Sequence, residues 1–332
     1  MTNGDRVNYG NVVLMSASAL AALAFPFELF LFAYAFLGPL HYLTEISWLH
    51  QRSYFQRGRY GHLVLLAACA AFVGIDYVGV GEAANRAVST ISVVGAFLAA
   101  IALATIARPP WRIGAIALAF GVGWAVSGSA GAQKLFLLFV PTIIHVYVFT
   151  AAFIVLGALR AGTKSGWISL LAFAAFTGVV LLGATPATSP LPGEYVRAAY
   201  GGFADLNVAL ASSLGLGALG AGTDVFTSSA GVRVQRFIAF AYTYHYLNWF
   251  SKTSIIQWHR IPKPWAIANL VVWALSVGLY LWDFRIGLAV LFGLSFSHIV
   301  LEFPLNHRTF LEIVDQLRGR SAGGSAAGAS HT

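Results

Sequence analysis

The chain has 332 residues, of which 58% are hydrophobic and only 10% are charged, whereas a soluble domain usually carries about 25% charged residues. This composition excludes an ordinary soluble protein and predicts an all-α, polytopic transmembrane helix bundle with one domain. The formal net charge of +8 comes from Lys and Arg in short loops between apolar runs. These basic residues therefore indicate how the chain is oriented in the membrane, and they do not indicate binding of nucleic acid.

Apolar runs of about 20 residues, long enough to cross a bilayer, predict about nine spans, within a range of roughly eight to ten. They lie near 24–49, 60–80, 87–107, 112–130, 133–157, 165–184, 234–251, 264–282 and 285–304. The run from Val12 to Leu23 resembles a signal peptide, but it continues past Pro26 into a longer apolar helix and is expected to stay attached. The stretch 206–222 is open to three interpretations: a further span, a re-entrant helix or an interfacial helix.

The transmembrane domain is predicted to cover residues 1–315. Residues 316–332 are rich in Gly, Ala and Ser and are predicted to form a disordered tail, because they cannot bury apolar area. Nine spans with the N-terminus outside and the C-terminus inside place most Lys and Arg on the inner side, as the positive-inside rule requires. The same rule disfavours 206–222 as a full span. We therefore expect an integral, multi-pass protein of a bacterial cytoplasmic membrane.

Four histidines, His41, His145, His245 and His298, lie inside or at the edge of predicted spans. Ionisable side chains are costly inside a bilayer, so their presence there indicates function. In the predicted topology, all four spans run from outside to inside and place the histidines in the inner half of the bilayer, within a band of roughly 12 Å. A shared depth favours one common site, and imidazole is a ligand for Fe, Zn and Cu.

Two of these histidines have a glutamate four residues later, Glu45 after His41 and Glu302 after His298, so each pair shares one helix face. The carboxylate of such a pair can bind a metal ion or orient a ligating imidazole. The alternative is a polar couple that only holds helices together. His50 and His307 come nine residues after the first histidine of each pair and fall on the opposite face. Interfacial or outer roles are favoured for these two.

Taken in order, four segments resemble the motifs of the Brp/Blh family of membrane β-carotene central-cleavage dioxygenases, which make retinal. The matching segments are Gly38 to Glu45 (family Gly-x-x-His-x-x-x-Asp), Ile143 to His145 (Ile-Ile-His), His245 to Phe250 (His-x-x-x-His-Phe) and His298 to Phe303 (His-hydrophobic-Asp-Phe). The chain departs from the pattern at Trp249, where the family has a second histidine. It also departs at Glu45 and Glu302, where the family has aspartates.

The resemblance implies an O₂-dependent, non-haem Fe(II) oxygenase that cleaves a lipophilic, carotenoid-like polyene to aldehydes. It implies that the four intramembrane histidines hold the iron and that the two glutamates act as catalytic residues by fixing imidazole tautomers. The expected partners are a lipophilic substrate, O₂ and membrane lipid, whereas the oligomeric state is not predicted. Two other functions stay open. One is a non-enzymatic membrane protein or transporter that uses the His–Glu pairs as a proton or substrate relay, and the other is a haem-binding membrane protein.

Overall fold

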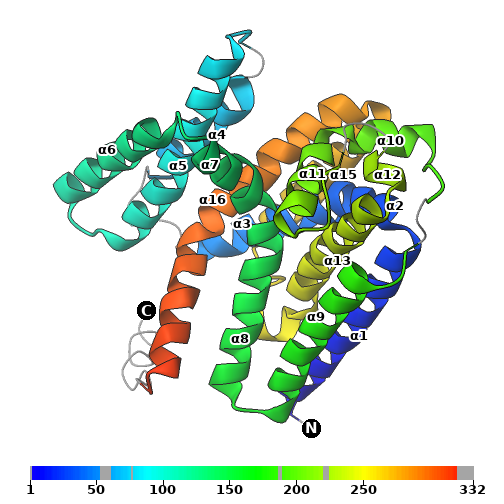
Figure 1. Cartoon of the computed structure of the whole chain (residues 1–332). Helices are drawn as coiled ribbons and strands as arrows, with labels where there is room; N and C mark the ends of the chain where they lie inside the picture. The colour runs from blue at the N-terminus through cyan, green and yellow to red at the C-terminus, as the bar shows by residue number, and fades with distance from the viewer. Residues whose placement is uncertain (1, 53–60, 76–77, 186–188, 220–223, 320–332) are drawn as a thin grey trace.

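Figure 1 shows a computed structural model of the chain, which describes residues 2–52, 61–75, 78–185, 189–219 and 224–319. These residues form helices and contain no β-strand, so the prediction of an all-α fold is confirmed. By length and composition, 7 of the described helices are apolar enough to cross a membrane. They are Asn3–Ala24, Pro26–Gln51, Glu82–Thr105, Ala130–Ala161, Lys164–Leu182, Lys263–Trp282 and Phe284–Leu317.

The N-terminal helix α1 (Asn3–Ala24) is a separate element, which corrects the expectation of one helix continuing past Pro26. Phe25 leaves the helical conformation with φ −137° and ψ 60°, and α2 (Pro26–Phe32) begins at the proline. A proline lacks the N–H that a helix interior needs but fits the first turn of a new helix. The chain then continues through a short π-helical segment, η1 (Ala33–Leu37), into α3 (Gly38–Gln51).

The remaining predicted spans correspond to helices of the structure. These helices are α4 (Gly61–Gly74), α5 (Glu82–Thr105), α6 (Pro109–Val126), the run of α7 (Ala130–Gln133), π-helical η3 (Lys134–Phe149) and α8 (Thr150–Ala161), α9 (Lys164–Leu182), α13 (Ser229–Ser251), α15 (Lys263–Trp282) and α16 (Phe284–Leu317). Short helices connect them: α10 (Glu194–Tyr200), η4 (Gly201–Phe203), α11 (Ala204–Ser213), α12 (Asp224–Thr227) and α14 (Thr253–Ile256).

The stretch 206–222 does not form a span in its described part. It begins inside α11, which has only 10 residues and is too short to cross a bilayer. Residues 220–222 lie outside the described part of the chain. The same holds for residues 320–332, most of the predicted tail, while α16 extends to Leu317, slightly beyond the predicted domain end.

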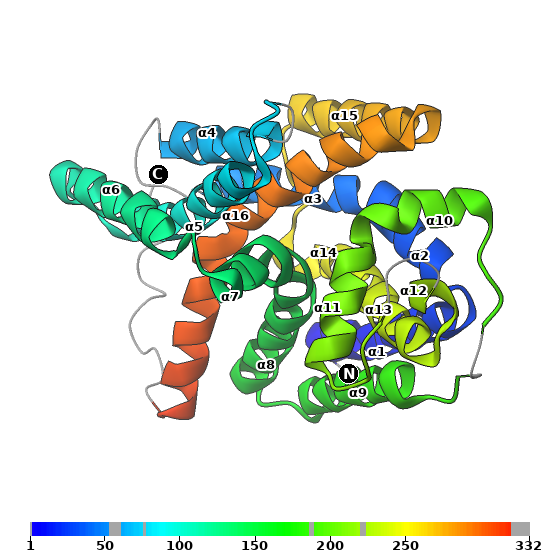
Figure 2. The same ribbon diagram turned by 45° about the horizontal axis from the view of Figure 1, so that its top comes forward.

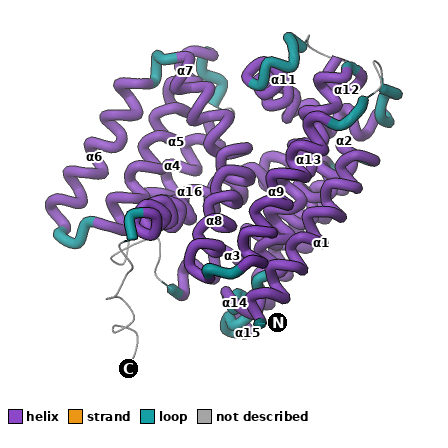
Figure 3. The backbone as a smooth tube through the Cα atoms, turned by 60° about the horizontal axis from the view of Figure 1, so that its bottom comes forward, coloured by secondary structure: helices purple, strands orange, loops and turns teal. Residues whose placement is uncertain are grey.

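The helices form two groups that meet along α16 (Figures 1 and 2). On one side α1, α9 and α13 pack against one another, and on the other side α4 and α5 pack together with α6. Figure 3 shows α16 between α4 and α5 on one side and α8 on the other. Two apolar core clusters result, and both contain residues of η3 and α16. These two elements therefore lie where the groups join.

The outer faces of the bundle are apolar, as expected for contact with lipid chains. Leu182 on α9 is 75% exposed, Trp282 on α15 is 78% exposed and Trp124 on α6 is 72% exposed. Soluble monomers seldom expose so many large apolar side chains together. The long apolar helices and these exposed faces agree with an integral, multi-pass membrane protein.

Candidate metal centre

The four intramembrane histidines meet in the interior of the bundle. His41 comes from α3, His145 from η3, His245 from α13 and His298 from α16. One ring nitrogen of each lies within 4.8 Å of a ring nitrogen of every other. The Nε2 atoms of His145 and His298 are 3.0 Å apart. All four side chains are buried, with His245 the most exposed at 6%. The structure thus brings together the four histidines that the sequence indicated.

A glycine allows the helices around the cluster to pack closely. A Cβ atom at Gly38 would lie 2.8 Å from Oη of Tyr42 and 3.3 Å from Oη of Tyr246. The glycine therefore leaves space for the hydrogen bond of 2.6 Å between these two tyrosines. The Tyr42 ring in turn stacks on the ring of His298, with centroids 4.2 Å apart. This packing gives a physical reason for the glycine at the start of the first histidine segment.

Two of the imidazoles are oriented through Nδ1, which leaves Nε2 directed into the cluster. The Nδ1 of His245 lies 2.8 Å from Oγ1 of Thr150, the first residue of α8. The Nδ1 of His298 donates to the backbone carbonyl of Ser295 at 2.5 Å. The Nε2 of His245 has no hydrogen-bond partner among the described residues. Holding one ring nitrogen by an outer partner is the usual arrangement of metal-binding histidines.

Both glutamates of the His–Glu pairs reach the cluster. Oε2 of Glu45 is 3.2 Å from Nε2 of His41, and Oε2 of Glu302 is 3.3 Å from Nδ1 of His145. Neither contact is aligned as a hydrogen bond, so all four atoms have no hydrogen-bond partner within the part of the chain described. Glu302 therefore contacts a histidine of another helix and not its sequence partner, whereas Glu45 contacts the histidine one turn before it.

These observations fit a bound metal ion. A buried polar atom without a partner costs about 1–3 kcal/mol, and coordination would satisfy several such atoms at once. Metal–ligand bonds of about 2.0–2.2 Å place neighbouring ligand atoms of one ion about 3 Å apart, close to the 3.0 Å between His145 and His298. The cluster can therefore hold a metal ion, and imidazole with carboxylate is a donor set that suits iron, among other ions.

Trp249, at the position where the Brp/Blh pattern has a histidine, lies beside the cluster. Its ring centroid is 5.6 Å from that of His41, and its Nε1 donates to Oγ1 of Thr44 at 3.1 Å. An indole N–H is only a donor and cannot bind a metal ion. The site nevertheless contains four imidazoles, because His298 is one of them.

His50 and His307 are not part of the cluster. His50 is exposed at the end of α3, where its ring stacks on Trp265 with centroids 5.2 Å apart. His307 is only partly buried on α16, and neither belongs to the groups of close metal-binding side chains found in the described residues.

Sequence reasoning missed three residues of the site: Thr150, Ser295 and Asn306. Thr150 and the Ser295 carbonyl act on histidines through tertiary or backbone contacts, for which no sequence motif exists. Asn306 follows Glu302 by four residues and is 1% exposed. The spacing of four residues from His298 to Glu302 to Asn306 is the signal that would have identified it.

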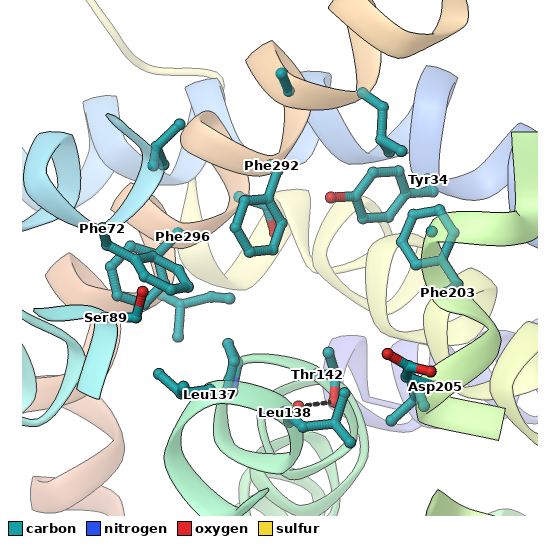
Figure 4. Close-up of a pocket in the computed structure, with 18 of the residues that line it drawn as sticks. Tyr34, Phe72, Ser89, Leu137, Leu138, Thr142, Phe203, Asp205, Phe292 and Phe296 are labelled. Atoms are coloured by element: carbon teal, nitrogen blue, oxygen red, sulfur yellow. Dashed lines mark hydrogen bonds between the residues drawn. The ribbon is translucent and has the colours of Figure 1, made fainter. Parts of the chain in front are cut away.

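An aromatic cavity of about 480 Å³ lies on one side of the cluster. Its lining includes Thr142, Tyr242 and Ser295, each three residues before a histidine of the cluster. Three residues rise about 4.5 Å along a helix, so the cavity lies roughly one turn from the imidazoles. Figure 4 shows Tyr34 and Phe203 at one side of it, and Phe72, Phe292 and Phe296 along the other. These rings come from η1, η4, α4 and α16.

A second cavity of about 480 Å³ reaches the cluster, because His41 and Glu45 are part of its lining. His245 and Glu302 contribute to its wall, which continues along α13 and α16 to Lys252 and Arg308 near the ends of these helices. Burial lowers the pKa of Lys252 to about 8. The histidine cluster thus lies between an aromatic cavity and a second one whose wall carries more charged side chains.

No family model, curated protein or solved structure matches this chain. The fold and the site define the class of protein. It is a helical, integral membrane protein with a buried cluster of four histidines that can hold a metal ion.

Proposed function

We propose that the protein is a membrane-embedded non-haem iron oxygenase that cleaves a carotenoid-like polyene to aldehydes. The observation that carries the proposal is the group of four buried imidazoles, with ligand atoms all within 4.8 Å of one another. The order of the four histidine segments, which resembles the Brp/Blh pattern, supports the choice of reaction. In that reaction one C=C bond and one O₂ molecule give two C=O groups, so no further co-reactant is needed.

Iron held by neutral imidazoles would supply the binding and reduction of O₂. The protein's own residues have the remaining tasks of orientation and shielding. Thr150 and the Ser295 carbonyl fix the rings of His245 and His298. The buried surroundings exclude water, which protects reactive species from side reactions.

The aromatic cavity supports a flat, apolar substrate. Its volume of about 480 Å³ falls in the range of about 300–1,000 Å³ typical of small-molecule sites. The rings shown in Figure 4 line this space, and three charged residues, Arg86, Asp205 and Arg285, are also part of its lining. A conjugated hydrocarbon chain matches such walls and would enter from the surrounding lipid.

Metal content tests the first half of the proposal. Detergent-purified protein should contain iron by elemental analysis and show no Soret band. His145→Ala and His298→Ala should each lower iron retention at least about tenfold, because losing a ligand costs no less than losing an outer partner of a ligand. His50→Ala, which removes an exposed histidine outside the cluster, serves as the control and should retain iron. Full retention of iron in both cluster variants would refute the proposal.

Activity tests the second half. Purified, iron-loaded protein incubated with β-carotene should form an aldehyde product that requires O₂ and is absent from the His145→Ala variant. Protein that binds iron but converts no carotenoid would support the proposed metal site and refute the proposed substrate. Proton-coupled transport by metal-free protein would instead favour the relay function.

A further inference from the structure

We propose that the cluster contains a second cation site, formed by Glu45, Glu302 and Asn306, for an oxygen-preferring divalent ion. This inference extends the proposed metal centre and depends on the histidines holding the first ion. It assigns the two glutamates a direct part in metal binding, beyond the orientation of imidazoles.

The site arises because α3 and α16 each carry a His–Glu pair with the same spacing, and the two pairs lie side by side in the bundle. Each has a histidine followed four residues later by a glutamate, which rises about 6 Å along the helix. The rings of His41 and His298 meet edge to face, with centroids 5.2 Å apart. The carboxylates of Glu45 and Glu302 consequently meet as well, and each offers an oxygen within 4.8 Å of the other and of a His298 nitrogen. The carboxylates form a second layer beside the imidazoles.

The two carboxylates are buried and close together. Each residue is only 2% exposed, so little water screens the repulsion between two negative charges. Among the described residues, their ion-pair partners are the imidazoles of His41 and His145 and not a lysine or arginine. A divalent cation between the carboxylates would compensate both charges.

Buried polar atoms without a hydrogen-bond partner at and beside the two carboxylates give independent support for a cation site. Oε2 of Glu45, Oε2 of Glu302 and both amide atoms of Asn306 have no hydrogen-bond partner in the described parts of the chain. The Asn306 side chain lies beside the Glu302 carboxylate and is 1% exposed. An amide oxygen and two carboxylates are ligands that Mg²⁺, Mn²⁺ and Fe²⁺ accept.

His298 sets the order of affinity of the two sites. Its Nδ1 donates to the Ser295 carbonyl, so only its Nε2 can bind a metal ion, and one nitrogen serves one ion. The second ion therefore relies mainly on oxygen ligands and should bind more weakly than the ion held by four imidazoles. Both glutamates line the second cavity, which gives this layer access to ions from the helix ends.

The test is a count of metal ions on the full-length, iron-loaded protein titrated anaerobically with Mn²⁺. We expect one tightly bound iron and one weaker Mn²⁺ per chain. The Glu45→Gln/Glu302→Gln double variant should lose the Mn²⁺ and still bind iron in a His145-dependent way, with an iron affinity lowered about 10–100-fold by loss of the carboxylates beside His41 and His145. Asn306→Leu, which removes only the amide, should weaken Mn²⁺ binding at least about tenfold. If the double variant fails to fold, Asn306→Leu alone decides, measured by the electron paramagnetic resonance signal of Mn²⁺.

Glu312→Gln is the matched control, because Glu312 lines the same cavity but pairs with Arg160. This variant should bind both ions. Wild-type protein that binds iron in a His145-dependent way but no Mn²⁺ would overturn the second site and leave the proposed function intact. Protein that binds no metal would refute both. A protonated-carboxyl infrared band that disappears in the double variant would show that the glutamates share a proton instead of a cation.

Discussion

The ring of His245 is oriented by the protein itself, through a single contact with a neighbouring helix. Thr150 begins α8 and places its hydroxyl 2.8 Å from Nδ1 of His245. The contact fixes the rotation of the ring, so Nε2 keeps its direction toward the other imidazoles. A residue outside the group of four histidines thus controls how well one candidate ligand is placed.

Thr150→Val removes this hydroxyl at nearly constant volume. We expect metal affinity to fall about 10–100-fold, the usual effect of losing an outer partner of a ligating histidine. The measurement is the rate at which a chelator removes the metal from purified protein. Thr150→Ser retains the hydroxyl and should behave like the wild type, whereas an unchanged rate in Thr150→Val would show that the contact does not orient the ring.

At this scale, sequence reasoning identified the four candidate ligands that the structure brings together, but not the residues that orient them. The four histidines stand out because ionisable residues are rare in apolar segments. Thr150 does not stand out, since a threonine in a transmembrane helix is common and its contact joins residues 95 positions apart. The contact of Glu302 with His145 could not be predicted from the sequence either, because only the packing of α16 against η3 brings these residues together.

Among the helices, α16 contributes most to the site, since it carries His298, Glu302 and Asn306 and packs against α4 and α5 on one side and α8 on the other. It begins with a tight approach to α15. A Cβ atom at Gly287 would lie 2.3 Å from the backbone Cα of Tyr280, and backbone cannot rotate away as a side chain can. The position of α16, and with it the level of its three polar side chains, depends on this glycine.

Gly287→Ala should therefore destabilise the α15–α16 hairpin and lower the free energy of unfolding by about 1–3 kcal/mol, the usual effect of overpacking. We expect a lower midpoint of thermal unfolding in detergent, together with faster loss of metal. Gly278→Ala on α15 is the control, because a Cβ atom there would contact nothing within 4 Å. Equal midpoints for the two variants would contradict the close approach as a structural constraint.

Hydropathy predicts the existence of these helices well but not the break between α1 and α2. Apolar residues continue on both sides of Pro26, so the apolar run appears unbroken. The proline itself was the available signal, and its preference for the first turn of a helix explains the break. The short α11 was equally hard to assign, since weakly apolar, small residues fit a span, a re-entrant helix and a surface helix alike.

For the whole molecule, the separate α1 changes the relation between the two chain ends. The start of α1 and the end of α16 lie at the same end of the bundle in Figure 1. Contacts agree with this view, because Asp5 accepts a hydrogen bond from Ser165 at the start of α9, and Arg160 at the end of α8 pairs with Glu312 on α16. An additional helix before the predicted first span would add one membrane crossing.

We therefore expect both ends of the chain on the same side of the membrane, and the positive-inside rule makes that side the inner one. Side-specific reporters fused to either end should give the same result. A reporter inserted next to α12, which lies at the opposite end of the bundle in Figure 1, should report the other side. Ends on opposite sides, as the nine-span prediction places them, would show that α1 does not cross.

Three residues precede His145, His245 and His298 by about one helical turn, and their position shows how the cavity of such a protein can change without its histidine cluster. Thr142, Tyr242 and Ser295 face the aromatic cavity, while the histidines face one another. In the proposed enzyme, the side chains that contact the substrate and the side chains that bind the metal ion occupy successive turns of the same helices. Substitutions at Thr142, Tyr242 and Ser295 can then change the shape of the cavity and leave the positions of the histidines unchanged.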